Sequence, residues 1–165
     1  MVLKIHERLE HTDAENQATL TLPFELRQKS RLKATLDNGI EVGLMLQRGG
    51  LLRGGDLLRA EDGMIIKIIA AAESVSKVTH DDPLMLMRAS YHLGNRHVPL
   101  QITEDYLCYT HDHVLDDMVK GLGLQVECVM APFEPEGGAY GGGHKHGHDD
   151  HEEAHSHTHS HQHSH

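Results

Sequence analysis

Residues 91–101 read YHLGNRHVPLQ and lie at a change of structure in the second half of the chain. Gly94 and Asn95 suit the left-handed residue that ends a helix, so the helical pattern before them is expected to stop there. Residues 98–103 then have the apolar and β-branched composition of a strand. The segment therefore predicts a helix-to-strand junction, with His97 presented as an exposed side chain just beyond the helix.

The elements on either side of this junction predict one small domain. Asp82 followed by Pro83 indicates a helix start, since the carboxylate caps free N–H groups and proline fits the first helical position. Asp112 can cap a second helix in the same way. The expected elements are strand 73–79, helix 83–94, strands 98–103 and 106–110, helix 113–122 and strand 124–130. This is the order of a ferredoxin-like βαββαβ domain, which we place at residues 73–136.

The first half of the chain has the pattern of short strands and turns, with no convincing helix. Apolar and polar residues alternate at 19–22 and, less cleanly, at 32–36. The triplet DNG at 37–39 is a strong hairpin signal, because asparagine and glycine tolerate the positive backbone angles of such turns. We expect a small all-β barrel or sandwich over residues 1–72, which makes the whole chain α+β.

Composition and charge argue against several classes of protein. With 165 residues, 38% hydrophobic side chains and no tryptophan, the chain can build one ordinary domain or two small ones, whose modest cores oligomerisation would help. A formal net charge of −10 without a basic cluster argues against binding nucleic acid. The apolar stretch 64–72 is interrupted by Lys67 and is too short to span a membrane, and the N-terminus lacks a secretion pattern. We therefore expect a cytoplasmic protein.

The sequence lacks the usual motifs of nucleotide-binding, redox and metallohydrolase sites. The glycine pairs at 49–50 and 54–55 are not followed by the Gly-Lys-Ser/Thr of a phosphate loop. Cys108 and Cys128 lack the paired spacing of a zinc or redox motif, so we expect both to be buried as small apolar side chains. A His-Glu-x-x-His pattern, which would indicate a metal-dependent hydrolase, does not occur either.

Histidines are the most informative feature of the composition. Of the 17 in the chain, ten lie in a tail, residues 137–165, that opens with a glycine-rich linker. This tail has almost no apolar side chains, so we expect it to be disordered. An engineered purification tag is the alternative, but the interspersed Lys, Asp, Glu, Ser and Thr residues favour a native metal-binding tail. The tail histidines are His144, His146, His148, His151, His155, His157, His159, His161, His163 and His165.

Three further candidate ligands, His97, His111 and His113, lie in the part that is expected to fold. Any one of them alone could be an ordinary structural histidine, but their recurrence together with the tail favours metal binding. Neutral imidazole suits nickel, zinc, copper and iron, and ligand type alone does not choose among these metals.

Several segments together resemble the urease accessory protein E (UreE) family. They are residues 91–101, residues 111–118, which read HDHVLDDM, and residues 132–136, which read PFEPE. Arg31 and residues 51–56, which read LLRGGD, extend the likeness over essentially the whole chain.

This resemblance implies a homodimeric nickel metallochaperone that delivers nickel for assembly of the urease active site, and not an enzyme. It further implies an N-terminal β domain that binds peptide and a ferredoxin-like domain that binds metal and dimerises. His97 matches the histidine that the family places at the dimer interface, where both copies bind one nickel ion. His111 and His113 match a peripheral pair found in some members. The expected partners are the urease apoprotein and its accessory proteins, including the GTPase.

Two other functions are compatible with the same histidines. A cytosolic buffer for zinc, copper or nickel would need the tail but no specific client. A metal-dependent hydrolase would need about three ligands and a general base gathered in one pocket.

Overall fold

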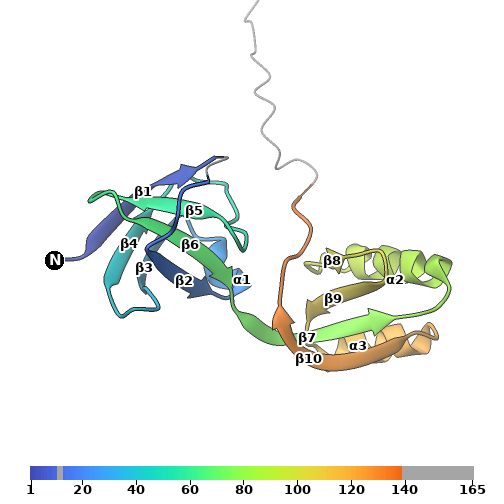
Figure 1. The fold of residues 1–165 in the computed structure, drawn as a ribbon. Coiled ribbons are helices and arrows are strands. Elements are labelled where there is room, and N and C mark those ends of the chain that lie inside the picture. Colours follow the sequence, from blue (N-terminus) through green and yellow to red (C-terminus); the bar gives the residue numbers. More distant parts are fainter. Residues whose placement is uncertain (11–12, 139–165) are drawn as a thin grey trace, which may run out of the picture.

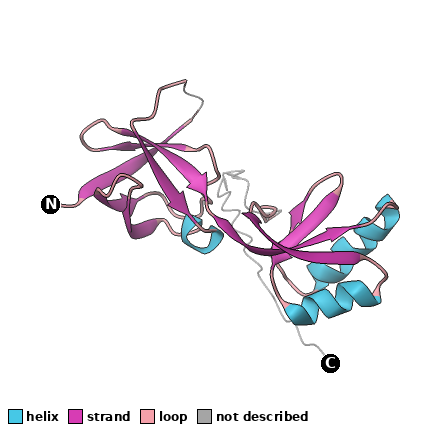
Figure 2. Ribbon diagram, turned by 60° about the horizontal axis from the view of Figure 1, so that its bottom comes forward, coloured by secondary structure: helices cyan, strands magenta, loops and turns pink. Residues whose placement is uncertain are grey.

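The computed structural model describes residues 1–10 and 13–138, and this part of the chain is an α+β protein built on two β-sheets (Figure 1). The secondary structure of the first half of the described chain consists almost entirely of strands, whereas the sheet of the second half carries two helices on one face (Figure 2). The two sheets are joined where β6 (Ile65–Ala70) leads into β7 (Ala72–Thr79). Within the described ranges, no helix is both long enough and apolar enough to cross a bilayer.

Six strands of the described chain form the first sheet, in the order β2-β6-β5-β1-β4-β3. Their bounds are β1 Leu3–Leu9, β2 Ala18–Leu22, β3 Arg31–Thr35, β4 Glu41–Met45, β5 Leu57–Ala60 and β6 Ile65–Ala70. The pairs β1–β4 and β2–β6 are parallel, and the other adjacent pairs are antiparallel. Because side chains alternate between the faces of a strand, every strand contributes apolar residues to one core. Fully buried members include Ile5, Leu20, Val42, Leu44, Leu58, Ile66 and Ile68.

Asp37 connects the two edge strands of this sheet and so gives it a barrel-like shape. Asp37 follows β3, and its backbone N–H donates to the carbonyl of Thr19 in β2 over 2.9 Å. Its carboxylate accepts hydrogen bonds from the hydroxyls of Thr19 and Thr21, at 2.5 and 2.8 Å. These bonds, that of Thr19 above all, favour the charged form and lower the pKa of the Asp37 carboxyl.

The predicted hairpin of the first half is confirmed, but the predicted absence of a helix is wrong. Strands β3 and β4 pair antiparallel across residues 37–39, and Gly39 has the positive φ of 91° that this turn requires. Phe24–Arg27 forms a short helix, α1, in which the carbonyl of Pro23 accepts two backbone hydrogen bonds of 3.1 Å. Four residues are too few to show helical periodicity, so the sequence pattern could not predict this turn.

The second sheet follows the predicted order of elements. The described elements are β7 Ala72–Thr79, α2 Pro83–Asn95, β8 Gln101–Ile102, β9 Tyr106–Thr110, α3 His113–Gly121 and β10 Gln125–Pro132. The strands lie in the order β10-β7-β9-β8, and all neighbours are antiparallel. Both predicted caps are confirmed, since the Asp82 carboxylate accepts from the Leu84 N–H over 2.9 Å and that of Asp112 from the Val114 N–H over 2.8 Å. The core between helices and sheet includes Val78, Ala89, Leu93, Leu107, Tyr109 and Val119.

The predicted strand 98–103 is too long. Only Gln101–Ile102 pairs with β9, as the edge strand β8. Pro99 has no N–H to donate to a sheet, and the His97 N–H bonds back to the helix at the Gly94 carbonyl over 3.0 Å. The chain between helix and strand is therefore a connection of its own and not part of the sheet.

The prediction for the two cysteines is right for Cys108 and wrong for Cys128. Cys108 is buried, and this burial raises the pKa of its thiol. Cys128 is exposed, because it lies on β10 at the edge of the sheet, where its Sγ is 3.3 Å from Ser74 Oγ.

Arg27 of α1 binds the last part of the described chain to the first sheet. Its side chain is 0% exposed, and its guanidinium donates to the carbonyls of Leu22 and Leu52 over 3.1 and 3.0 Å. The same group donates to the carbonyl of Phe133 and to the carboxylate of Glu134, which follow β10. The two sheets are therefore connected by side-chain hydrogen bonds as well as by the chain itself.

Candidate metal-binding surface

His97 lies at the C-terminal end of α2, in an unusual backbone conformation. The helix runs to Asn95 and is capped by Arg96, and His97 then has a φ of 56°. The left-handed residue is therefore His97 itself, and not Gly94 or Asn95 as predicted. Histidine is among the few residues other than glycine that adopt this region with some frequency. The His97 side chain is exposed, as the sequence predicted.

The helix that leads to His97 carries an exposed apolar stripe. Leu84, Met87 and Tyr91 are spaced by three and four residues, so they lie along one side of α2. Met87 and Tyr91 are 66% and 67% exposed, which is high for large apolar side chains. The ring of His92 stands edge-on to that of Tyr91, with 5.4 Å between ring centroids. The stripe approaches the end of the helix that presents His97.

His111 follows β9, and one nitrogen of its ring contacts buried polar groups of the second sheet and its helices. Its Nδ1 lies 3.1 Å from Ser76 Oγ and 3.3 Å from Asp116 Oδ2. The other carboxylate oxygen, Asp116 Oδ1, accepts a hydrogen bond of 2.6 Å from the hydroxyl of the fully buried Tyr109. Burial and the Asp116 carboxylate both raise the pKa of the Tyr109 hydroxyl, so this group is a proton donor at any physiological pH. His111 is thus an exposed imidazole fixed by one ring nitrogen.

His113 is the first residue of α3 and is exposed. It is separated from His111 by Asp112, whose carboxylate is occupied in capping the helix at Val114 and Leu115. Asp112 is therefore a structural residue between two candidate ligands.

The described residues contain no group of three or more His, Cys, Asp or Glu side chains placed to hold one metal ion. The structure brings neither His97 nor the pair His111 and His113 into a complete coordination shell within residues 1–10 and 13–138. The ten histidines predicted as ligands in the tail, together with most of their glycine linker, lie outside the described residues.

The sequence did not reveal that Ser76, Tyr109 and Asp116 support a candidate ligand. Asp116 is buried although it is charged, because it lies three residues before the buried Val119 on the inner side of α3. A charged residue at an inward-facing helical position was the available signal, since such groups are rarely buried without partners. The partners Ser76 and Tyr109 come from other strands and could not be paired with it by spacing.

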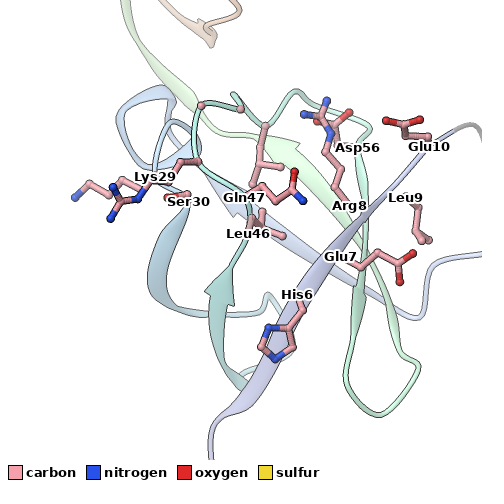
Figure 3. A pocket seen from close by; sticks show the side chains of 14 residues that line it. His6, Glu7, Arg8, Leu9, Glu10, Lys29, Ser30, Leu46, Gln47 and Asp56 are labelled. Atoms are coloured by element: carbon pink, nitrogen blue, oxygen red, sulfur yellow. The ribbon is translucent and has the colours of Figure 1, made fainter. Parts of the chain in front are cut away.

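The first sheet carries a groove that lies away from the candidate ligands. It is a groove of about 980 Å³ between β1 and the chain that follows β4, and charged side chains line much of it (Figure 3). Within it, Arg8 forms an ion pair of 2.9 Å with Asp56. Residues 46–50 line the groove as well.

Family models match both halves of the chain. The model of the UreE urease accessory protein, N-terminal domain, matches residues 2–71, and that of the C-terminal domain matches residues 73–165. The chain belongs to the UreE urease accessory protein family.

Individual UreE proteins match most of the chain. A urease accessory protein UreE of Alkalilimnicola ehrlichii is 62% identical over 141 residues, which are 86% of each chain. One of Citrobacter koseri is 56% identical over 140 residues, 84% of this chain and 91% of its own. One of Pseudomonas putida strain W619 is 55% identical over 140 residues, 84% of this chain and 86% of its own. The family so identified is named as an accessory protein family and not as an enzyme family.

Proposed function

We propose that this UreE protein is a homodimeric nickel metallochaperone that delivers nickel for assembly of the urease active site. The observation that carries the proposal is His97, an exposed imidazole fixed at a helix end beside an apolar stripe. An exposed side chain on a fixed backbone suits a metal ion that must be bound and then passed on. Nickel is here the cargo and not a resident cofactor.

A second copy of the chain is the partner that would complete the His97 site. Large exposed apolar side chains on one helix are typical of surfaces that associate. A two-fold axis near the end of α2 would bring two copies of His97 together and leave other coordination positions open. Since the described residues of one chain gather no complete set of ligands, binding through two copies explains how a single histidine can serve. An incomplete shell also allows release to the next protein.

The other histidines would act as lower-specificity ligands. We assign His111 and His113 to a peripheral site, and the ten tail histidines to a reservoir that holds several ions loosely. Imidazole would also accept zinc or copper, and affinity ordering favours copper over both nickel and zinc, so selection for nickel must come from the geometry at His97 or from supply.

The two halves of the chain would have different partners. We propose that residues 1–72 form a peptide-binding domain, for which the groove in Figure 3 is the natural site. Residues 73–136 would be the ferredoxin-like domain that binds metal and dimerises, and 137–165 the tail. The partners would be the urease apoprotein and its accessory proteins, including the GTPase, in the cytoplasm. A metal buffer without a client is the alternative, and the tail histidines alone would suffice for it.

Urease activation at limiting nickel tests the proposal. His97→Asn is the informative change, because asparagine tolerates the left-handed backbone that alanine would strain. We expect this variant to keep its dimer and its tail-bound nickel but to lose delivery. His92→Asn, which changes another exposed histidine of the same surface, is the matched control and should activate urease normally.

The same assay separates the two functions. Delivery by His97→Asn at the wild-type level, with an unchanged dimer population in sedimentation, would contradict the interface site. If deletion of the whole protein leaves urease activation intact while metal tolerance falls, the chain is a buffer and not a carrier.

A further inference from the structure

The polar groups beneath His111 form a connected network that comes from three different elements. Ser76 lies on β7, Tyr109 on β9 and Asp116 on α3, and all three are buried. Ser76 and Asp116 both approach Nδ1 of His111, which itself lies on the surface, and Tyr109 hydrogen-bonds to Asp116 from behind. Burying the Asp116 carboxylate is energetically unfavourable. An apolar residue would therefore be expected at position 116 if only packing mattered.

The direction of each hydrogen bond follows from Asp116. An ionised carboxylate only accepts, so Tyr109 must donate its hydroxyl proton to Asp116 Oδ1, over 2.6 Å. Ser76 Oγ lies 3.1 Å from His111 Nδ1, and a hydroxyl can either donate or accept there. The other neighbour of Nδ1, Asp116 Oδ2 at 3.3 Å, presents only lone pairs.

The Asp116 carboxylate therefore decides the tautomer, since the Ser76 hydroxyl fits either form. A ring with its proton on Nε2 would place the Nδ1 lone pair against the lone pairs of Asp116 Oδ2, which is unfavourable. A ring with its proton on Nδ1 donates to that carboxylate and leaves Nε2 unprotonated and directed away from the network. Of the two neutral forms of imidazole, the network selects the second.

We propose that Asp116, with Ser76 and Tyr109, is a positioning residue that fixes His111 in the Nδ1–H tautomer, so that Nε2 is presented to a metal ion. The inference rests on the proposed nickel-binding function, and it deepens it by assigning a role to three buried residues. Carboxylates that hold the outer N–H of a metal-binding histidine fix its orientation and raise its basicity, and their loss costs about 10- to 100-fold in metal affinity. In the described chain, His113 and His97 have no such support.

Nitrogen NMR of the full-length, metal-free protein tests the tautomer directly. Long-range proton–nitrogen correlations distinguish a protonated ring nitrogen from an unprotonated one, and the His111 signals are identified by their absence in His111→Gln. At a mildly alkaline pH, where the ring is neutral, we expect Nδ1 of His111 to be protonated and Nε2 not. A free imidazole in water, which averages over both tautomers, provides the reference pattern.

Asp116→Asn and Asp117→Asn form a matched pair. Both remove one negative charge from neighbouring positions of α3, but Asp117 is exposed and does not contact His111. In Asp116→Asn, the amide oxygen can accept from Tyr109 while its NH₂ group donates to Nδ1, so the proton should move to Nε2. Asp117→Asn should keep the wild-type tautomer. Asp116→Ala, which removes both carboxylate oxygens from beside Nδ1, provides a second variant if Asp116→Asn does not fold, and should give a mixture of both forms.

Nickel titration followed at the same signals links the tautomer to metal binding. Paramagnetic nickel broadens the signals of the residues near it, so binding at His111 is read separately from binding at the tail. We expect Asp116→Asn to need about 10- to 100-fold more nickel for the same broadening of His111, and Asp117→Asn to match the wild type.

The tautomer measurements would overturn the inference in three ways. They are a wild-type His111 protonated at Nε2, a tautomer that neither Asp116→Asn nor Asp116→Ala changes, and a changed tautomer that leaves nickel binding at His111 unaltered. The proposed function is tested separately, and it fails if His97→Asn still delivers nickel. The tautomer result does not depend on that outcome, because it is measured on the metal-free protein. Normal delivery by a wild-type chain whose His111 is never broadened by nickel overturns this inference alone.

Discussion

Replacing Arg27 by methionine should sharply destabilise the protein. The side chain is 0% exposed and donates four hydrogen bonds, to three carbonyl oxygens and to Glu134. Methionine has a similar length but no donor, so the three buried carbonyl oxygens would lose their partner without gaining water, whereas Glu134 is 29% exposed and keeps access to water. Each buried acceptor left without a partner costs about 1–3 kcal/mol. We expect Arg27→Met to lower the free energy of unfolding by at least about 3 kcal/mol.

Arg59→Met is the matched control in the same sheet. Arg59 also forms an ion pair, with Glu7 over 3.1 Å, but the two side chains are 49% and 53% exposed. Water and salt screen such a pair, and it contributes about 0–1 kcal/mol. Urea unfolding followed by circular dichroism should therefore separate the two variants clearly. Equal losses of stability in Arg27→Met and Arg59→Met would refute the assignment of Arg27 as a buried connection.

The same experiment tests whether Arg27 couples the two halves of the chain. All four tyrosines lie after residue 90, so tyrosine fluorescence reports on the second half, whereas circular dichroism reports on both. The two transitions should coincide in the wild type and separate in Arg27→Met, since the bonds from Arg27 to Phe133 and Glu134 would be gone. Coincident transitions in the variant would show that the halves are coupled by other contacts.

Three further outcomes are expected. A chain ending at Gly143 should lose most of its bound nickel in equilibrium dialysis but remain a folded dimer, because residues 144–165 contain almost no apolar side chains; unchanged stoichiometry would contradict this. Nickel binding should weaken as the pH falls below the ordinary histidine value of about 6.5, because protons compete for imidazole, and a flat profile in titrations would indicate other ligands. Asp37→Asn should lower the free energy of unfolding at neutral pH but not in strong acid. The lowered pKa of Asp37 means that its contribution is present above the unfolded pKa and is lost as the pH falls through the folded one, so a loss that persists in acid would argue against it.

Local signals in the sequence determined where two helices and one turn begin. The caps at Asp82 and Asp112 and the turn at 37–39 are chemical requirements of single helix starts and one tight turn, so a few residues suffice to reveal them. Helix α1 and strand β8 were mispredicted, because elements of four and two residues are too short to form a periodic pattern.

The sequence also pointed to His97, His111 and His113 as candidate ligands, since exposed histidines at element ends are visible as a pattern of residue types. It did not reveal that His97 takes the left-handed position, because Gly94 and Asn95 are the more usual occupants and the choice depends on where the helix stops. The helix ends at Asn95, and the N–H groups of Arg96 and His97 then bond back to the carbonyls of Leu93 and Gly94.

Only the tertiary structure decided which residues stand behind these ligands. Ser76, Tyr109 and Asp116 are separated by up to 40 positions in the chain, and they meet because β7 pairs with β9 while α3 packs across them. The contacts of Arg27 with Phe133 and Glu134 span more than one hundred residues in the same way. Short-range chemistry is written in neighbouring residues, whereas the partners of a buried polar group are set by strand order and helix packing, which no local pattern encodes.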